Sequence, residues 1–194
     1  MPETQPTSRD RLLDVGRTLF WRRGYHDVGL LEILRTAEVP KGSFYHHFTS
    51  KEGFALEVID AFARDSLAEL DAALAVPGTP AERLLGYFRA QRSRYGDNGC
   101  CAGCLLGNFG QELADSNDLF RQRVEGHMRG VVERFAAVLA EGVGESGAVD
   151  PATTAEMLLT GWHGALLRMK VHKRLEPIDT FLRFHFGDQA GLSH

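Results

Sequence analysis

The sequence has no long apolar run. Its densest one, residues 135–140, spans only six positions between Arg134 and Glu141, whereas a helix that crosses a membrane needs about 20. The first ten residues are polar and have no apolar centre of the kind that secretion signals carry. We therefore expect a cytoplasmic protein with no membrane partner.

Cysteine is scarce, and its three copies all lie between positions 100 and 104. An odd number in one cluster does not form the disulfide framework of a small secreted protein. Cys101 and Cys104 have C-x-x-C spacing, but no second Cys or His pair follows at a ligand spacing. We expect no metal site and no cofactor.

Charge is distributed unevenly along the 194 residues, whose net charge is −4. Residues 1–51 carry eight Lys and Arg against six Asp and Glu, and residues 52–194 carry 14 against 20. A basic head on an acidic body is typical of a polyanion-binding module attached to another domain.

Helical periodicity runs through almost every segment, and no segment alternates with the period of a strand. Thr7 with Asp10 forms a capping box, and Gly24 ends the helix that this box begins. We predict an all-α fold of about nine helices. The expected helix starts lie near Thr7, Leu30, Pro40, Thr49, Thr79, Leu105, Asp118, Asp150 and Pro177.

Residues 29–48 have the shape of a helix-turn-helix, two short helices separated by about four residues. In the second helix Phe44 and Phe48 share one face, which turns to the core. The opposite face is small, polar, aromatic and cationic, which suits the major groove of DNA. A merely solvated face is the alternative, although histidines and a tyrosine beside a glycine are poor helix formers. The candidate DNA-binding residues are Lys41, Gly42, Ser43, Tyr45, His46, His47 and Lys51.

The string VPKGSFYHHF-x-SKE resembles the DNA-binding domain of the TetR/AcrR family of bacterial transcriptional regulators. The resemblance implies a DNA-binding domain over residues 7–67 and a ligand-binding and dimerisation domain over residues 75–190. It implies a homodimeric repressor that reads a palindromic operator and releases it when a small-molecule effector enters the second domain.

The resemblance also implies roles for single residues. It places Lys41 and Ser43 next to bases, and Tyr45, His46, His47 and Lys51 at phosphates. Two positions depart from the family pattern: Val28 stands where a threonine usually caps the second helix, and Glu38 stands where the turn usually has glycine.

Cys104 is expected in the first turn of the sixth helix, where the positive end of the helix dipole lowers the pKa of a thiol. The string GCLLGNFGQELAD resembles the branch of the family whose regulators respond to electrophiles and acrylate-like molecules, which implies a sensor thiol. A cysteine that only packs is the alternative. The candidate effector-sensing residues are Cys101, Cys104, Trp162, His163 and Lys170.

Helices eight and nine are expected to form the dimer interface. They carry more apolar surface than one thin helical layer can hide, and small residues that let helices approach closely. The candidate interface residues are Leu158, Gly161, Ala165, Leu166, Phe181 and Phe184.

Two other functions remain alternatives. One is a small cytosolic thiol-dependent redox enzyme that uses Cys101 and Cys104, and the other is a helical interaction module that binds no DNA. No base at diagnostic spacing and no phosphate-binding glycine loop after a strand accompanies the cysteines, so we do not expect an enzyme.

Overall fold

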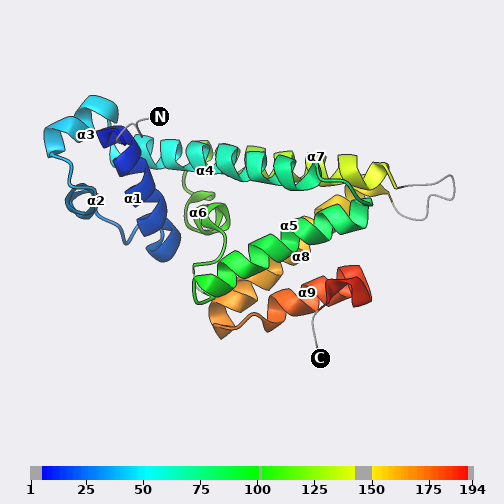
Figure 1. Ribbon diagram of the computed structural model, residues 1–194. Coiled ribbons are helices and arrows are strands. Elements are labelled where there is room, and N and C mark those ends of the chain that lie inside the picture. Colours follow the sequence, from blue (N-terminus) through cyan, green and yellow to red (C-terminus); the bar gives the residue numbers. More distant parts are fainter. Residues whose placement is uncertain (1–5, 101, 143–149, 192–194) are drawn as a thin grey trace, which may run out of the picture. The chain divides into compact units, whose positions relative to one another are not determined.

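A computed structural model describes residues 6–100, 102–142 and 150–191, and these form helices without any strand (Figure 1). The all-α prediction is confirmed. Within the described residues no helix is both long and apolar enough to span a bilayer. The helices are α1 Ser8–Arg23, α2 Leu30–Thr36, α3 Lys41–His47, α4 Lys51–Leu74, α5 Pro80–Asp97, α6 Leu105–Leu113, α7 Asp118–Ala140, α8 Pro151–His172, α9 Glu176–Phe186 and the 3₁₀ turn η1 Gly187–Ala190.

The predicted capping box at the start of α1 is present. The Thr7 hydroxyl accepts from the Asp10 amide, and the Asp10 carboxylate accepts from the Thr7 amide at 3.0 Å. Hydrogen bonds to the ionised carboxylate, first from the Thr7 hydroxyl at 2.6 Å and then from the Thr7 amide, hold the pKa of Asp10 below its usual value. Gly24 ends the helix with φ +84°, a backbone conformation that favours glycine.

The start of α4 differs by one residue from the predicted start near Thr49, where Thr49 and Glu52 have the spacing of a capping box. Instead Ser50 caps the helix, because its hydroxyl accepts from the amide of Gly53 at 3.0 Å. Glu52 accepts from the side chain of Asn117. Thr49 and Ser50 are both good capping residues, and the helix begins one residue later than the motif suggested.

Both departures from the family pattern are visible around α2. Val28 is fully buried, and Gly29, the N-cap of α2, offers no side-chain cap. In the turn that follows, Glu38 has φ +54°, which costs a residue with a side chain about 1 kcal/mol. The helix-turn-helix therefore forms with a strained residue in its turn.

The chain divides into two compact units. The N-terminal unit consists of the residues up to 64 together with 105–124, and the C-terminal unit consists of 65–104 together with the residues from 125 onward. Helix α6, which the sequence assigns to the second domain, thus packs within the N-terminal unit.

Phenylalanines fill the core of the N-terminal unit. Phe44 and Phe48 of the helix-turn-helix pack against Phe54 of α4, with ring centroids 5.5 and 4.9 Å apart from it. Phe54 also contacts α1 so closely that a Cβ at Gly16 would lie 2.3 Å from its ring. Large buried side chains of this kind each stabilise the fold by about 2–3 kcal/mol, so α3 is held in one orientation.

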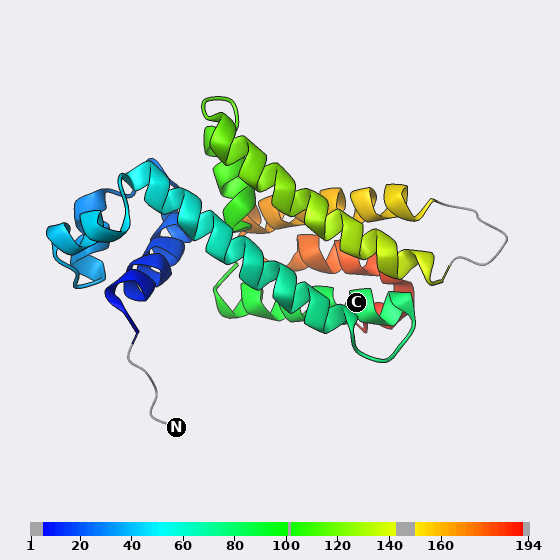
Figure 2. The same cartoon turned by 90° about the horizontal axis from the view of Figure 1, so that it is seen from above.

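A second aromatic cluster forms the core of the C-terminal unit. Phe88 of α5 contacts Trp162 of α8 and Phe181 of α9 at centroid distances of 4.9 and 5.1 Å. Arg92 of α5 adds an ion pair with Asp179 of α9. Helices α5, α8 and α9 therefore form one packed group, with α8 and α9 side by side (Figures 1 and 2).

Candidate functional site

The outer face of α3 has the character that the sequence predicts. Phe44 is fully buried, while Lys41, Gly42, Tyr45 and His46 are exposed. Among the described atoms, nothing lies within 4 Å of where a Cβ of Gly42 would be. The Lys41 ammonium lies 5.9 Å from the centre of the Tyr45 ring, which keeps a cation on the exposed face.

Ser43 and His47 differ from these residues because they are half-buried and face α1. Nε2 of His47 lies 3.0 Å from the hydroxyl oxygen of Ser8. The Ser43 hydroxyl donates to the same oxygen over 3.4 Å. A contact to α1 was not predicted, and it joins residues 35 or more positions apart.

Lys51, the first residue of α4, has its ammonium engaged within the protein. It donates to the carbonyl oxygen of Tyr25 at 2.6 Å and lies 4.1 Å from the centre of that tyrosine ring. Burial lowers the pKa of Lys51, and the charge of Glu112 opposes that shift. A lysine has three donors, so one is used here.

Helix α6 binds the end of α1 through two side chains one turn apart. The Glu112 carboxylate accepts from the amides of Tyr25 and His26, at 2.9 and 3.1 Å. Asn108 donates to the carbonyl of Trp21 at 3.3 Å. A Cβ at Gly24 would lie 1.9 Å from the same carboxylate, so only glycine fits there. Glu112 and Asn108 were not singled out from the sequence, since neither belongs to a recognisable motif.

The cysteine loop has an unusual backbone. Cys100 and Ala102 both have positive φ, as do Gly99 and Gly103, and such conformations cost about 1 kcal/mol or more in residues other than glycine. Cys104 follows this loop directly and is half-buried. It precedes Leu105, the first residue of α6, rather than lying in the first turn as predicted. Cys101 lies outside the described residues.

Two buried tyrosines of α5 interact electrostatically with Cys104. Burial raises the pKa of both Tyr87 and Tyr95, and the charge of Cys104 raises each of them further. Both hydroxyls therefore remain protonated around neutral pH. The chain thus places neutral phenols near this thiol.

The other predicted effector residues lie on α8. Trp162 is only 5% exposed and packs in the aromatic core. His163 is half-buried, and burial lowers its pKa. Lys170 is half-buried in the last turn of the helix. Trp162 is positioned as a packing residue.

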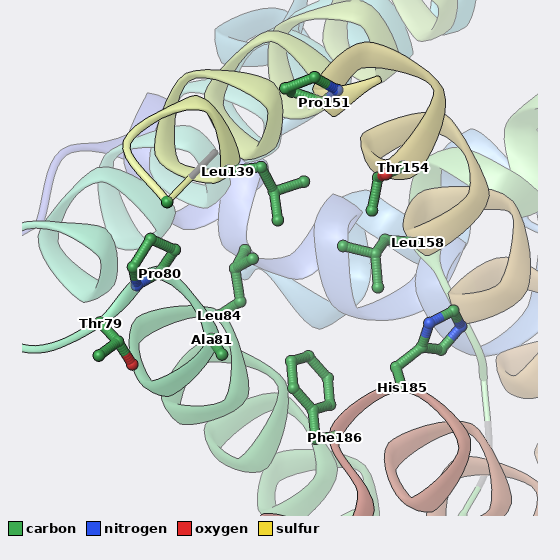
Figure 3. Close-up of a pocket in the computed structure, with 11 residues that line it drawn as sticks. Thr79, Pro80, Ala81, Leu84, Leu139, Pro151, Thr154, Leu158, His185 and Phe186 are labelled. Atoms are coloured by element: carbon green, nitrogen blue, oxygen red, sulfur yellow. The ribbon is translucent and has the colours of Figure 1, made fainter. Parts of the chain in front are cut away.

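A cavity of about 540 Å³ lies in the C-terminal unit. Leu84, Leu139, Leu158 and Phe186 come from four helices and point toward one another around it (Figure 3). Its remaining described lining residues are Thr79, Pro80, Ala81, Gly142, Pro151, Thr154 and His185. The cavity has the size and apolar character of a small-molecule site. The predicted effector-sensing residues Trp162, His163 and Lys170 are not among its described lining residues.

Most of the residues predicted for the dimer interface are buried inside the protomer. Gly161 packs against the Phe181 ring, 3.2 Å from where its Cβ would lie. Phe184, in contrast, is 83% exposed. The predicted residues that belong to the core are Leu158, Ala165, Leu166 and Phe181.

Other apolar side chains of the same two helices are exposed instead. Met157, Leu167 and Val171 lie on α8 at spacings of ten and four residues, which put them on one face. Gly164 lies on the same face and has open space beside it in the described structure. Together with Phe184 of α9 these residues form the exposed apolar face of α8 and α9.

Comparison with known proteins identifies the family. Residues 12–58 match the model of bacterial regulatory proteins of the tetR family, and residues 80–185 match a tetracyclin repressor-like C-terminal domain. The chain belongs to the TetR family. The family resemblance inferred from the helix-turn-helix string is thereby confirmed, and a second family model matches the C-terminal part of the chain.

Individual TetR-family relatives match over nearly the whole length. The transcriptional repressor DhaR of Mycobacterium sp. strain GP1 is 36% identical over 185 residues, 92% of this chain and 90% of DhaR. The crystal structure of reduced Escherichia coli NemR is 31% identical with TM-score 0.83, and covers 91% of this chain and 94% of its own. A regulatory protein TetR structure from Rhodobacter sphaeroides is 35% identical with TM-score 0.86, and covers 93% and 97%.

These similarities establish a transcriptional regulator of the TetR type whose relatives include named repressors. The thiol-dependent enzyme finds no support among them.

Proposed function

We propose that the protein is a cytoplasmic, homodimeric repressor that binds a palindromic operator through α3 of each protomer. The observation that carries the proposal is the exposed face of α3, held in one orientation by Phe44 and Phe48 in the core. A helix with a polar and cationic outer face enters the major groove and reads base edges. TetR-family membership supports this function.

The residues of this face take two kinds of role. Lys41 and Ser43 read base edges, while Tyr45, His46 and Lys51 contact phosphate oxygens. Contacts to phosphate release counterions, so affinity falls steeply with salt concentration. His47 belongs to the predicted phosphate set, but its Nε2 faces Ser8.

A gel shift with the DNA that flanks the protein's own coding region tests this function. We expect a dimeric complex, two half-sites about one helical turn apart or slightly more, and a steep salt dependence. A protein that fails to discriminate this DNA from an unrelated duplex at moderate salt would contradict the proposal.

The dimer forms through the exposed apolar face of α8 and α9. Phe184 and Val171 are 83% and 70% exposed, and burying such side chains against a second copy is favourable by about 2 kcal/mol each. The two-fold symmetry of a dimer matches the palindrome of the operator.

The effector signal enters at Cys104. The adjoining loop holds Cys100 and Ala102 in strained conformations, and α6 begins at the next residue. Because Glu112 of α6 binds the amides of Tyr25 and His26, a displacement of α6 would disturb the end of α1. The crystal structure of the relative NemR is of a reduced form, and this supports a redox-sensitive group in the present chain.

N-ethylmaleimide tests the thiol. The Cys104 thiolate adds across the electron-poor double bond, a C–S bond forms, and a proton reaches the neighbouring carbon. We expect the adduct at Cys104 by mass spectrometry and a 5- to 150-fold loss of operator affinity, the roughly 1–3 kcal/mol of an ordinary coupling. Cys104→Ser is expected to bind DNA normally and to resist the reagent, with Cys100→Ser as the matched control.

Release of DNA from treated Cys104→Ser would refute the sensor thiol. The cavity around Leu84 and Leu158 would then be the remaining effector site, and its apolar lining favours an uncharged effector.

A further inference from the structure

The hydroxyl of Ser8, in the first turn of α1, contacts two side chains of α3. It lies 3.0 Å from Nε2 of His47, and the Ser43 hydroxyl donates to it over 3.4 Å. The three side chains are half-buried, so water competes less for these bonds than on an open surface. Ser8 therefore acts on the orientation of the Ser43 hydroxyl.

Orientation matters because a serine hydroxyl has one proton and two lone pairs. A free serine can donate to a base edge or accept from it, and so reads either kind. When Ser43 gives its proton to Ser8, only its lone pairs remain for another partner. The chain of bonds is consistent with the tautomer of His47 whose Nε2 carries no proton: Ser8 then accepts from Ser43 and gives its own proton to Nε2.

We propose that Ser8 and His47 are positioning residues for sequence recognition, which hold the Ser43 hydroxyl as a hydrogen-bond acceptor. An acceptor selects a base that presents an exocyclic amine in the major groove, which is adenine or cytosine. This inference rests on the proposed function, because it requires Ser43 to face a base. It also gives His47 a role in base selection instead of a phosphate contact.

Selection of binding sites from a random DNA pool tests the inference with four proteins: wild type, Ser43→Ala, Ser8→Ala and Ser8→Thr. The wild type is expected to select adenine or cytosine at the position that Ser43→Ala relaxes. Ser8→Ala frees the Ser43 proton, so discrimination against guanine and thymine at that one position falls about 2- to 10-fold, the value of one hydrogen bond. Ser8→Thr keeps a hydroxyl and should keep the wild-type consensus.

The outcomes separate this inference from the proposed function. If Ser43→Ala leaves the consensus unchanged, base reading by Ser43 is wrong. If Ser43→Ala relaxes a position and Ser8→Ala does not, only the inference is wrong. A wild type that selects guanine or thymine at that position overturns it as well.

A second variant guards against loss of folding at the start of α1. His47→Leu removes the acceptor at the other end of the chain of bonds and should relax the same position as Ser8→Ala. Thermal unfolding confirms that each variant is folded before selection. A uniform loss of affinity with an unchanged consensus in both variants would show a purely structural role.

Discussion

Helix α3 and the α8–α9 pair both present side chains to the outside, but the chemistry of the two surfaces is opposite. Around α3 the exposed groups are an ammonium, a phenol and an imidazole, on Lys41, Tyr45 and His46. On α8 and α9 large apolar side chains are exposed, and Val171 and Phe184 are the most exposed of these. Polar groups with open space around them suit a hydrated polyanion, whereas exposed hydrocarbon favours exclusion of water.

The two surfaces also differ in the packing that orients their helices. Phe44 and Phe48 fix the rotation of α3 by burying one side of a seven-residue helix. Helix α8 buries one apolar side in its own unit and leaves another apolar side exposed. A substitution on α3 should therefore change DNA binding alone, and a substitution on the α8–α9 face should change assembly first.

The largest effect is expected from a charge in the apolar face. Phe184→Glu would bury an unpaired carboxylate in the dimer, at a cost of about 3–5 kcal/mol. Sedimentation should then show monomers, and operator affinity should collapse because one half-site makes too few contacts. Phe184→Leu is the matched control and should stay dimeric. A dimeric Phe184→Glu protein would show that the interface lies elsewhere.

The next effect is expected from the buried histidine of α7. His127 on α7 has Nδ1 buried without a hydrogen-bond partner in the described part of the chain. Burial, and then the charges of His163 and Arg134, lower the pKa of His127 to about 4 from 6.5. The unfolded chain binds this proton below about pH 6.5 and the folded protein does not. Stability should therefore fall by about 2 kcal/mol between about pH 8 and pH 5.

Chemical denaturation across that pH range measures the loss. His127→Gln should flatten the pH dependence, apart from the smaller contribution of His163, whose pKa is lowered in the same direction. Equal slopes for His127→Gln and wild type would place the titration elsewhere.

A smaller effect should separate the two lysines that are proposed to contact DNA. Lys51→Ala should weaken binding to all sequences by about 1 kcal/mol and lower the salt slope by about one unit for each protomer, since it removes a phosphate contact. Lys41→Ala should change base preference at one position per half-site by about 1–3 kcal/mol. Salt titrations on several operators distinguish them. If Lys51→Ala alters the consensus with its slope intact, Lys51 does not contact phosphate.

The outer face of α3 could be predicted because two phenylalanines four residues apart define which side is buried. No such signal separates the residues of α8. Leu158 and Leu166 lie in the core while Met157 and Leu167 are exposed, and all four are large and apolar. Hydropathy records that a face is apolar, but it does not record whether the same chain or a second copy covers it.

Contacts between residues that lie far apart in the sequence could not be predicted either. Ser8 meets Ser43 across 35 positions, and Glu112 meets Tyr25 across 87. Such pairs depend on how helices pack, which no local spacing records. The cap of α4 shows a local limit, since Thr49 and Ser50 are both eligible and a shift of one residue decides between them.

The smallest expected effect tests the turn that carries α3. Glu38 has φ +54° and joins α2 to α3, so its strain works against the orientation on which DNA binding depends. Glu38→Gly removes the clash of a Cβ in that conformation, worth about 1–2 kcal/mol, while the freer unfolded chain offsets about half of it. The net gain in unfolding free energy should be about 0.5–1 kcal/mol by chemical denaturation.

Glu32→Gly, inside α2 where φ is helical, is the opposite control and should lose about 1 kcal/mol. Operator affinity of Glu38→Gly should remain at the wild-type level, because the bonds of the turn, from the amides of Glu38 and Val39 to Arg35 and Leu34, involve backbone alone. A destabilised Glu38→Gly protein would mean that the Glu38 side chain stabilises the turn more than its backbone conformation costs.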